Sequence, residues 1–240
     1  MKTKIYRAKD RGHADYGWLE ANYSFSFANY QNRDRENFGA LRVLNDDRIR
    51  GNTGFAEHPH HNMEIVTIPL EGTLKHKDSM SNTWITLETG EVEVMSAGSG
   101  LMHSERNNSA TEELNLFQIW VIPDQTGVAP AYDQKRFDPA DRKNKLQTLV
   151  SSYRDAGENR LKMHQDAQIS RTDLDKGQRL AYQLRSSGHG VYIMSISGKV
   201  RLNDIELNKR DALGVWQTEQ FELEAVEDAE ILFIEVPMFF

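Results

Sequence analysis

The sequence predicts an all-β protein made of two strand-rich halves. Its predicted strands are short, turn residues cluster between them, and they recur at the regular spacing that is typical of a sandwich or barrel. A strand, a Ser-Gly or Glu-Gly turn and a second strand follow one another at residues 70–74 and again at residues 196–200. This shared texture indicates a duplicated β-fold.

Five segments of the first half are predicted strands because they are apolar or alternate between apolar and polar residues. They are residues 41–44, 63–69, 84–87, 92–95 and 114–122. Turns are predicted between them at Asn45-Asp46-Asp47, Glu71-Gly72, Thr89-Gly90-Glu91 and Gly98-Ser99-Gly100. The last of these lets the chain turn sharply into a strand that carries His103.

The composition shifts at residues 131–145 to Asp, Lys, Arg, Pro and Gln with few apolar residues, which favours a linker. A second strand-rich half follows it. Its predicted strands are residues 168–174, 191–196, 199–202 and 231–236.

Composition excludes several classes of protein. The net charge of -7 argues against direct binding of nucleic acid or an anionic membrane, which needs a basic face. The chain has no cysteine, so a bound metal must use nitrogen and oxygen ligands. We find no signal-peptide core, no apolar run approaching the roughly 18 residues of a membrane span, and no nucleophile elbow or phosphate-binding loop. We therefore expect a cytoplasmic protein.

Two short pairs carry the strongest chemical signal, His58 with His60 and His103 with Glu105. Residues two apart on a strand point to the same face, so each pair presents both side chains to one side. Pro59 favours an extended backbone at His58, which helps to hold the first pair in one orientation. If the two strands are neighbours, three imidazoles and one carboxylate converge, a set that suits a divalent transition metal with open positions.

The other histidines fit a ligand role less well. His61 faces away from His60 on an extended chain and is expected at the surface or as an outer neighbour of the site. His76 either forms an outer hydrogen bond or lies in a solvated loop, and Glu64 either orients a ligand or pairs with an arginine. Three histidines have no partner at ligand spacing: His13, His164 and His189.

The segments around these pairs resemble the pirin family of the cupin superfamily. The resemblance rests on residues 57–67, Leu70-Glu71-Gly72, residues 76–79 and residues 95–105, and it is dense over residues 11–137, for example at Gln118-Ile119-Trp120. It is looser in the second half, as at residues 164–167. Tyr23 stands where relatives often have His, and Thr89-Gly90-Glu91 replaces a Pro-Gly-Asp turn.

The resemblance implies a bicupin, with two jelly-roll β-barrels packed face to face. We expect residues 1–137 to form an N-terminal metal-binding cupin domain and residues 138–240 a C-terminal cupin-like domain without a metal site. The resemblance carries the metal-ligand roles onto the residues that spacing selects: His58, His60, His103 and Glu105. Iron(II) is the first expectation, and a set of three nitrogens and one oxygen also binds Ni, Co, Cu, Mn or Zn.

Bacterial pirin-like proteins include quercetin 2,3-dioxygenases, so the resemblance implies a dioxygenase that opens the flavonol heterocycle with O2 and releases carbon monoxide. The flavonol would chelate the metal, and Glu105 would act as the catalytic base for its hydroxyl proton. The native substrate is a flavonol or another chelating phenol or enol. The chain is expected to be a monomer.

The alternative is a metal-containing, redox-responsive regulator that binds a partner protein without turnover, because other pirins are described as transcription cofactors. Flavonol consumption with carbon monoxide release distinguishes the enzyme from this regulator.

Overall fold

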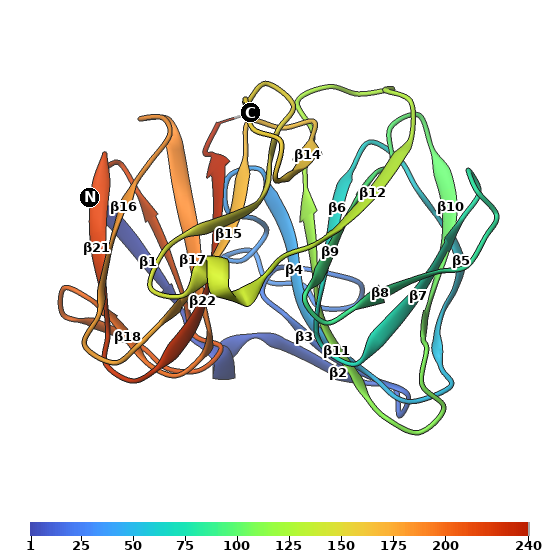
Figure 1. Cartoon of the computed structure of the whole chain (residues 1–240), viewed down its shortest axis with the longest axis horizontal. Coiled ribbons are helices and arrows are strands. Elements are labelled where there is room, and N and C mark those ends of the chain that lie inside the picture. Colours follow the sequence, from blue (N-terminus) through green and yellow to red (C-terminus); the bar gives the residue numbers. More distant parts are fainter. Residues whose placement is uncertain (240) are drawn as a thin grey trace.

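Two β-sandwiches packed against each other make up the protein, seen in a computed structural model that describes residues 1–239 (Figure 1). The all-β class predicted from the sequence is confirmed. Within the described range, the helical segments are two 3-10 turns, η1 (Ala8–Asp10) and η2 (Pro139–Arg142), and neither has the length and apolarity that crossing a membrane requires.

The first sandwich pairs a seven-stranded sheet with a four-stranded sheet. The larger sheet contains β2 (Gly12–Asp15), β3 (Leu19–Tyr23), β4 (Leu41–Ile49), β6 (Glu64–Glu71), β9 (Glu91–Ser96), β11 (Leu114–Val121) and β12 (Ala131–Arg136), in the order β12-β9-β6-β11-β4-β3-β2. The smaller sheet contains β5 (Gly54–His60), β7 (Thr73–Asp78), β8 (Ile85–Glu88) and β10 (Leu101–Asn107), in the order β5-β10-β7-β8.

The second sandwich repeats this plan. Its seven-stranded sheet contains β1 (Lys2–Tyr6), β13 (Gln147–Ser152), β14 (Leu161–Met163), β15 (Gln168–Leu174), β17 (His189–Ser197), β20 (Ala212–Trp216) and β22 (Ala229–Pro237), in the order β1-β20-β17-β22-β15-β13-β14. Its four-stranded sheet contains β16 (Arg179–Gln183), β18 (Val200–Leu202), β19 (Ile205–Leu207) and β21 (Gln220–Ala225), in the order β16-β21-β18-β19.

The two seven-stranded sheets face each other, so that four sheets lie in layers across the molecule (Figure 1). A single apolar cluster fills the space between them, with Phe117 from β11 and Tyr192 and Ile234 from the second sandwich. A strand in the middle of these sheets, such as β17, is buried on both faces and therefore has an apolar run through its centre. An outer strand such as β16 alternates instead, because one of its faces meets solvent.

The first strand does not lie in the first sandwich. β1 pairs antiparallel with β20, and Figure 1 shows its blue ribbon among the orange and red strands of the second sandwich. At the other end of the chain, the Pro237 carbonyl accepts a hydrogen bond from the Ala40 amide. Each end of the chain thus ties one sandwich to the other, while the division at residues 137 and 138 stays a prediction.

Two local predictions are wrong. Asn45-Asp46-Asp47 is not a turn but the middle of β4, held by antiparallel pairing with β3 and β11 on either side. The predicted linker at residues 131–145 begins with a strand, because β12 pairs with β9 along its length and only the residues after Arg136 connect the sandwiches. In both places ladder hydrogen bonds from neighbouring strands override the local turn and charge composition.

The interiors of the two sandwiches differ. The second is filled by one apolar cluster, whereas the first holds two smaller clusters, one around Leu74 and Leu116 and the other around Ile65 and Leu101. A polar row crosses the inner face of its large sheet in strand register: Tyr23, Asn45, Gln118, Thr67, Glu93 and Gln134. Burying polar groups without hydrogen-bond partners costs free energy, so this row indicates a functional site in the first sandwich.

Candidate metal centre

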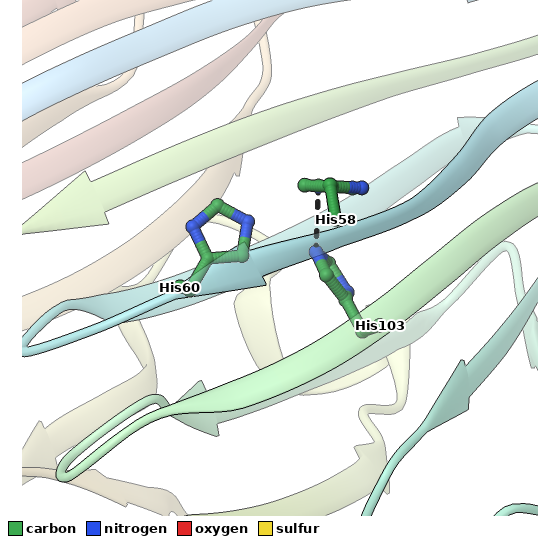
Figure 2. Close-up of side chains that lie close together, drawn as sticks. All are labelled: His58, His60 and His103. Atoms are coloured by element: carbon green, nitrogen blue, oxygen red, sulfur yellow. Dashed lines mark hydrogen bonds between the residues drawn. The ribbon is translucent and has the colours of Figure 1, made fainter.

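The two sequence pairs lie on neighbouring strands, as the spacing predicts if those strands pair. β5 carries His58 and His60, β10 carries His103, and the two strands are antiparallel with His103 directly opposite His58. Figure 2 shows the three imidazoles turned toward one another from the two strands. A register shift between His103 and Glu105 interrupts the ladder at this point, a bulge of the kind that re-aims side chains beside functional sites.

The three imidazoles form a compact cluster. Each of His58, His60 and His103 offers a ring nitrogen within 4.8 Å of the others. The Nε2 atoms of His58 and His103 are 3.0 Å apart, and Nδ1 of His58 lies 2.8 Å from the carbonyl oxygen of Ala56. Because a carbonyl only accepts, His58 donates from Nδ1 and keeps the lone pair of Nε2 facing His103.

The environment keeps two of the three imidazoles neutral. Burial, reinforced by His58 and His61, lowers the pKa of His60 to about 4. Burial and the neighbouring rings of His58, His60 and His76 lower the pKa of His103 to about 2. Neutral imidazole is the form that binds a metal ion, so the cluster presents ligands without first losing protons.

Trp120 fixes the ring of His60 from the opposite sheet. Their ring centroids are 4.9 Å apart at an interplanar angle of 86°, an edge-to-face contact. Sequence reasoning did not identify Trp120 as a site residue, although its position two residues after Gln118 on β11 places both side chains on one face.

Glu105 is buried and lies apart from the cluster of three histidines. Its carboxylate forms a second group with His76 and His103 within 4.8 Å, and it does not belong to the tight group of His58, His60 and His103. Gln118 donates a 2.9 Å hydrogen bond to its Oε2, whereas its buried Oε1 has no partner among residues 1–239. Burial, with the charge of Glu93, raises the pKa of Glu105.

His76 is fully buried, so the expectation of a solvated loop is wrong. It lies opposite Glu105 on β7, with Nε2 3.4 Å from Asp78 and Nδ1 3.8 Å from Glu93. Its ring also lies 4.8 Å from that of Tyr132, centroid to centroid. These neighbours place His76 behind the centre, on the side of His103 that is away from the cavity described below.

Glu64 has neither of its expected roles. It points between the sandwiches, where its Oε2 accepts hydrogen bonds from the Ser96 hydroxyl and the His164 amide. The two-residue alternation does not extend to Glu64, because β5 ends at His60, the chain turns at Asn62 with a φ of 46°, and Glu64 begins β6 in the other sheet. His61 is exposed, in agreement with the expected surface position.

A cavity of about 580 Å³ opens beside the centre, between the two sheets of the first sandwich. Its polar lining includes His58, His60 and Glu105, and its aromatic walls include Trp18, Phe27, Phe55 and Trp120. Tyr23, the departure from the family pattern, also lines it. Mostly apolar walls with a few converging polar groups are typical of small-molecule sites.

The donor set fits a divalent transition metal. Three imidazoles converge, and a buried carboxylate oxygen of Glu105, close to His103, lacks a hydrogen-bond partner in the described chain. The adjacent cavity leaves room for a ligand next to such an ion.

Comparison with known proteins places the chain among pirins. The pirin family model matches residues 5–121, and a model of the quercetinase C-terminal cupin domain matches residues 149–236. The chain is 41% identical to a quercetin 2,3-dioxygenase of Escherichia coli K12, over 97% of this chain and 98% of that protein. It is 40% identical to a pirin-like protein of Caulobacter vibrioides, over 93% of this chain and 95% of the relative.

Solved structures give the same result. A bacterial pirin, YhhW from Escherichia coli in complex with nickel(II), superposes with a TM-score of 0.91 at 38% identity, covering 98% of this chain and 99% of the other. A quercetin 2,3-dioxygenase from Acinetobacter baumannii shares the fold with a TM-score of 0.79 at 22% identity, covering 98% of this chain and 86% of the other.

Proposed function

Because this chain belongs to the pirin family, we propose that it is a metal-dependent dioxygenase that opens the heterocycle of a flavonol such as quercetin with O2 and releases carbon monoxide. The observation that carries the proposal is the meeting of three imidazoles with an aromatic-lined cavity of about 580 Å³. A flat polyphenol needs both a group that holds its oxygens and apolar walls for its rings.

His58, His60 and His103 hold the metal, and Glu105 supplies the oxygen ligand. Iron(II) is our first candidate. Nickel is the next, since a similar Escherichia coli pirin has been solved with nickel(II). The donor set itself does not select between iron and nickel. The order of affinities among the first-row divalent metals is similar at most sites of nitrogen and oxygen ligands, so the metal that is bound depends on which metal is available.

The protein's own residues bind, orient and deprotonate the ligand. Trp18, Phe55 and Trp120 line the cavity and pack on a planar aromatic molecule. Gln118 donates a hydrogen bond to Oε2 of Glu105 and so orients the carboxylate, which would hold the metal through one oxygen and accept the hydroxyl proton of the ligand at the other. A bound divalent ion acts as a Lewis acid that lowers the pKa of a chelated hydroxyl.

The test is metal analysis of the purified protein, paired with quercetin turnover in the presence and absence of O2. We expect quercetin consumption with carbon monoxide release only in air, and loss of both metal and turnover in His58→Ala and Glu105→Ala. His61→Ala, which removes an exposed imidazole of the same segment, is the matched control and should keep both. A protein that retains metal but consumes no flavonol contradicts the proposal and favours the redox-responsive regulator.

A further inference from the structure

Two polar side chains of β4 face the cavity without partners. Asn45 and Asp47 are each 2% exposed, both line the cavity, and Oδ1 of each lacks a hydrogen bond among residues 1–239. They stand on the large sheet, whereas His58 and His60 stand on the small one. Asn45 and Asp47 therefore belong to the wall opposite the histidines.

The residue between them shows that this lack of partners is particular to the cavity side. Asp46 points the other way and is fully engaged. Its Oδ2 lies 3.1 Å from Arg11 and 3.0 Å from Arg210, and its Oδ1 accepts a 3.1 Å hydrogen bond from Asn115. Asp46, on one face of β4, thus has three polar partners, whereas Oδ1 of Asn45 and Oδ1 of Asp47, on the cavity face, have none among residues 1–239.

Neighbouring strands offer the two side chains no compensation. Asn45 lies between Tyr23 and Gln118 in strand register, and Gln118 already donates to Glu105. Asp47 lies between Ala21 and Leu116, which have no polar side-chain atoms. Buried polar groups without partners destabilise a fold, so a ligand that hydrogen-bonds to both would relieve that cost.

We propose that Asn45 and Asp47 form a hydroxyl-binding subsite that selects phenolic ligands carrying a hydroxyl group remote from their metal-chelating oxygens. The inference rests on the proposed function and deepens it. Facing sheets of a sandwich lie about 10 Å apart, so a ligand held at the histidines can present its far end to this wall. Burial raises the pKa of Asp47 to about 8, so near neutral pH its protonated carboxyl offers a donor as well as an acceptor.

The test compares two flavonols that share the chelating 3-hydroxy-4-oxo unit: quercetin, with further ring hydroxyls, and 3-hydroxyflavone, without them. Binding is measured by fluorescence titration of the metal-loaded protein under anaerobic conditions. We expect wild type to bind quercetin roughly 10-fold more tightly than 3-hydroxyflavone, as hydrogen bonds to buried polar groups allow. Asn45→Leu and Asp47→Leu should abolish that ratio by weakening quercetin alone, and Asp47→Asn should retain most of it.

Phe55→Leu is the matched control, because it alters an apolar wall of the same cavity and should weaken both ligands together. Metal content and thermal unfolding of each variant show whether the centre and the fold are intact. Equal affinity of wild type for the two flavonols, or an equal loss of both in Asn45→Leu, overturns the subsite and leaves the proposed function standing. Failure of loaded wild type to bind either flavonol overturns the proposed function and the subsite with it.

Discussion

His58 and His103 face each other across the β5–β10 pair with their Nε2 atoms 3.0 Å apart. The Ala56 carbonyl, 2.8 Å from Nδ1 of His58, fixes which nitrogen of that ring carries the proton. Both residues would hold a metal ion bound at this cluster. The pairing of β5 with β10 therefore sets the distance between two of the candidate ligands.

Loss of the His58 side chain should weaken metal binding. His58→Ala removes a nitrogen whose orientation is already set, so we expect a fall in metal affinity greater than the roughly 10–100-fold loss that substitutions around a metal's ligands cause. The measurement is equilibrium dialysis followed by elemental analysis. His61→Ala should bind metal as wild type does, and equal losses in the two variants would show that the exposed imidazole is a ligand.

Gln118→Leu tests the hydrogen bond that holds Glu105. Without its 2.9 Å donor, the buried carboxylate lacks a fixed position, and we expect metal affinity to fall about 10–100-fold with the fold retained. Competition with a chromogenic chelator measures the affinity, and circular dichroism checks the fold. Gln134→Leu changes the far end of the same polar row and should leave the affinity unchanged.

Asp47 should make the free energy of unfolding fall as pH rises. Burial raises its pKa from 3.8 to about 8, so between these values the folded protein holds a proton that the unfolded chain has lost. The free energy of unfolding contributed by this group is present at low pH and declines as pH rises toward 8. Each unit of pKa difference is worth about 1.4 kcal/mol.

Urea denaturation of wild type and Asp47→Asn at pH values from 5 to 9 measures this contribution in the same metal-free state, a range set by the raised pKa. Asp47→Asn should gain stability relative to wild type as pH rises. A constant difference between the two proteins across the range would contradict the raised pKa.

The interface between the sandwiches should behave as a core. Phe117 is fully buried between the two seven-stranded sheets, and Arg210 of the second sandwich lies 4.9 Å from its ring centroid. Phe117→Ala should lower the free energy of unfolding by about 3–5 kcal/mol. Phe239→Ala, at a ring that is 88% exposed, is the control. Equal effects in chemical denaturation would mean that the sandwiches do not depend on this contact.

The sequence predicts the central strands and the histidine pairs well, for physical reasons. A central strand such as β22 is buried on both faces and apolar along most of its length, so its residues 231–236 are predicted as a strand. His58, His60 and His103 are found because the two-residue period of a strand is strict and the strands pair. The first strand is missed because its partner β20 lies some 200 residues away along the chain and nothing local marks the pairing.

One failure of local reasoning falls beside the site. Asn45 and Asp47 read as turn formers, yet they lie within a central strand where an apolar side chain would pack better. Departures from local preference are expected where function requires them. Glu64 is misplaced for a different reason, because the chain turns at Asn62 and passes from β5 into β6 of the other sheet, so His60 and Glu64 do not share one strand.

Anomalous diffraction from crystals of the metal-loaded protein, recorded at the absorption edge of the bound ion, shows directly which residues hold the metal. We expect one peak within bonding distance of His58, His60, His103 and Glu105, at the distances of about 2.0–2.2 Å that imidazole and carboxylate ligands show with zinc. A peak at His76, His103 and Glu105 without His58 and His60, or one in the second sandwich, would contradict this expectation.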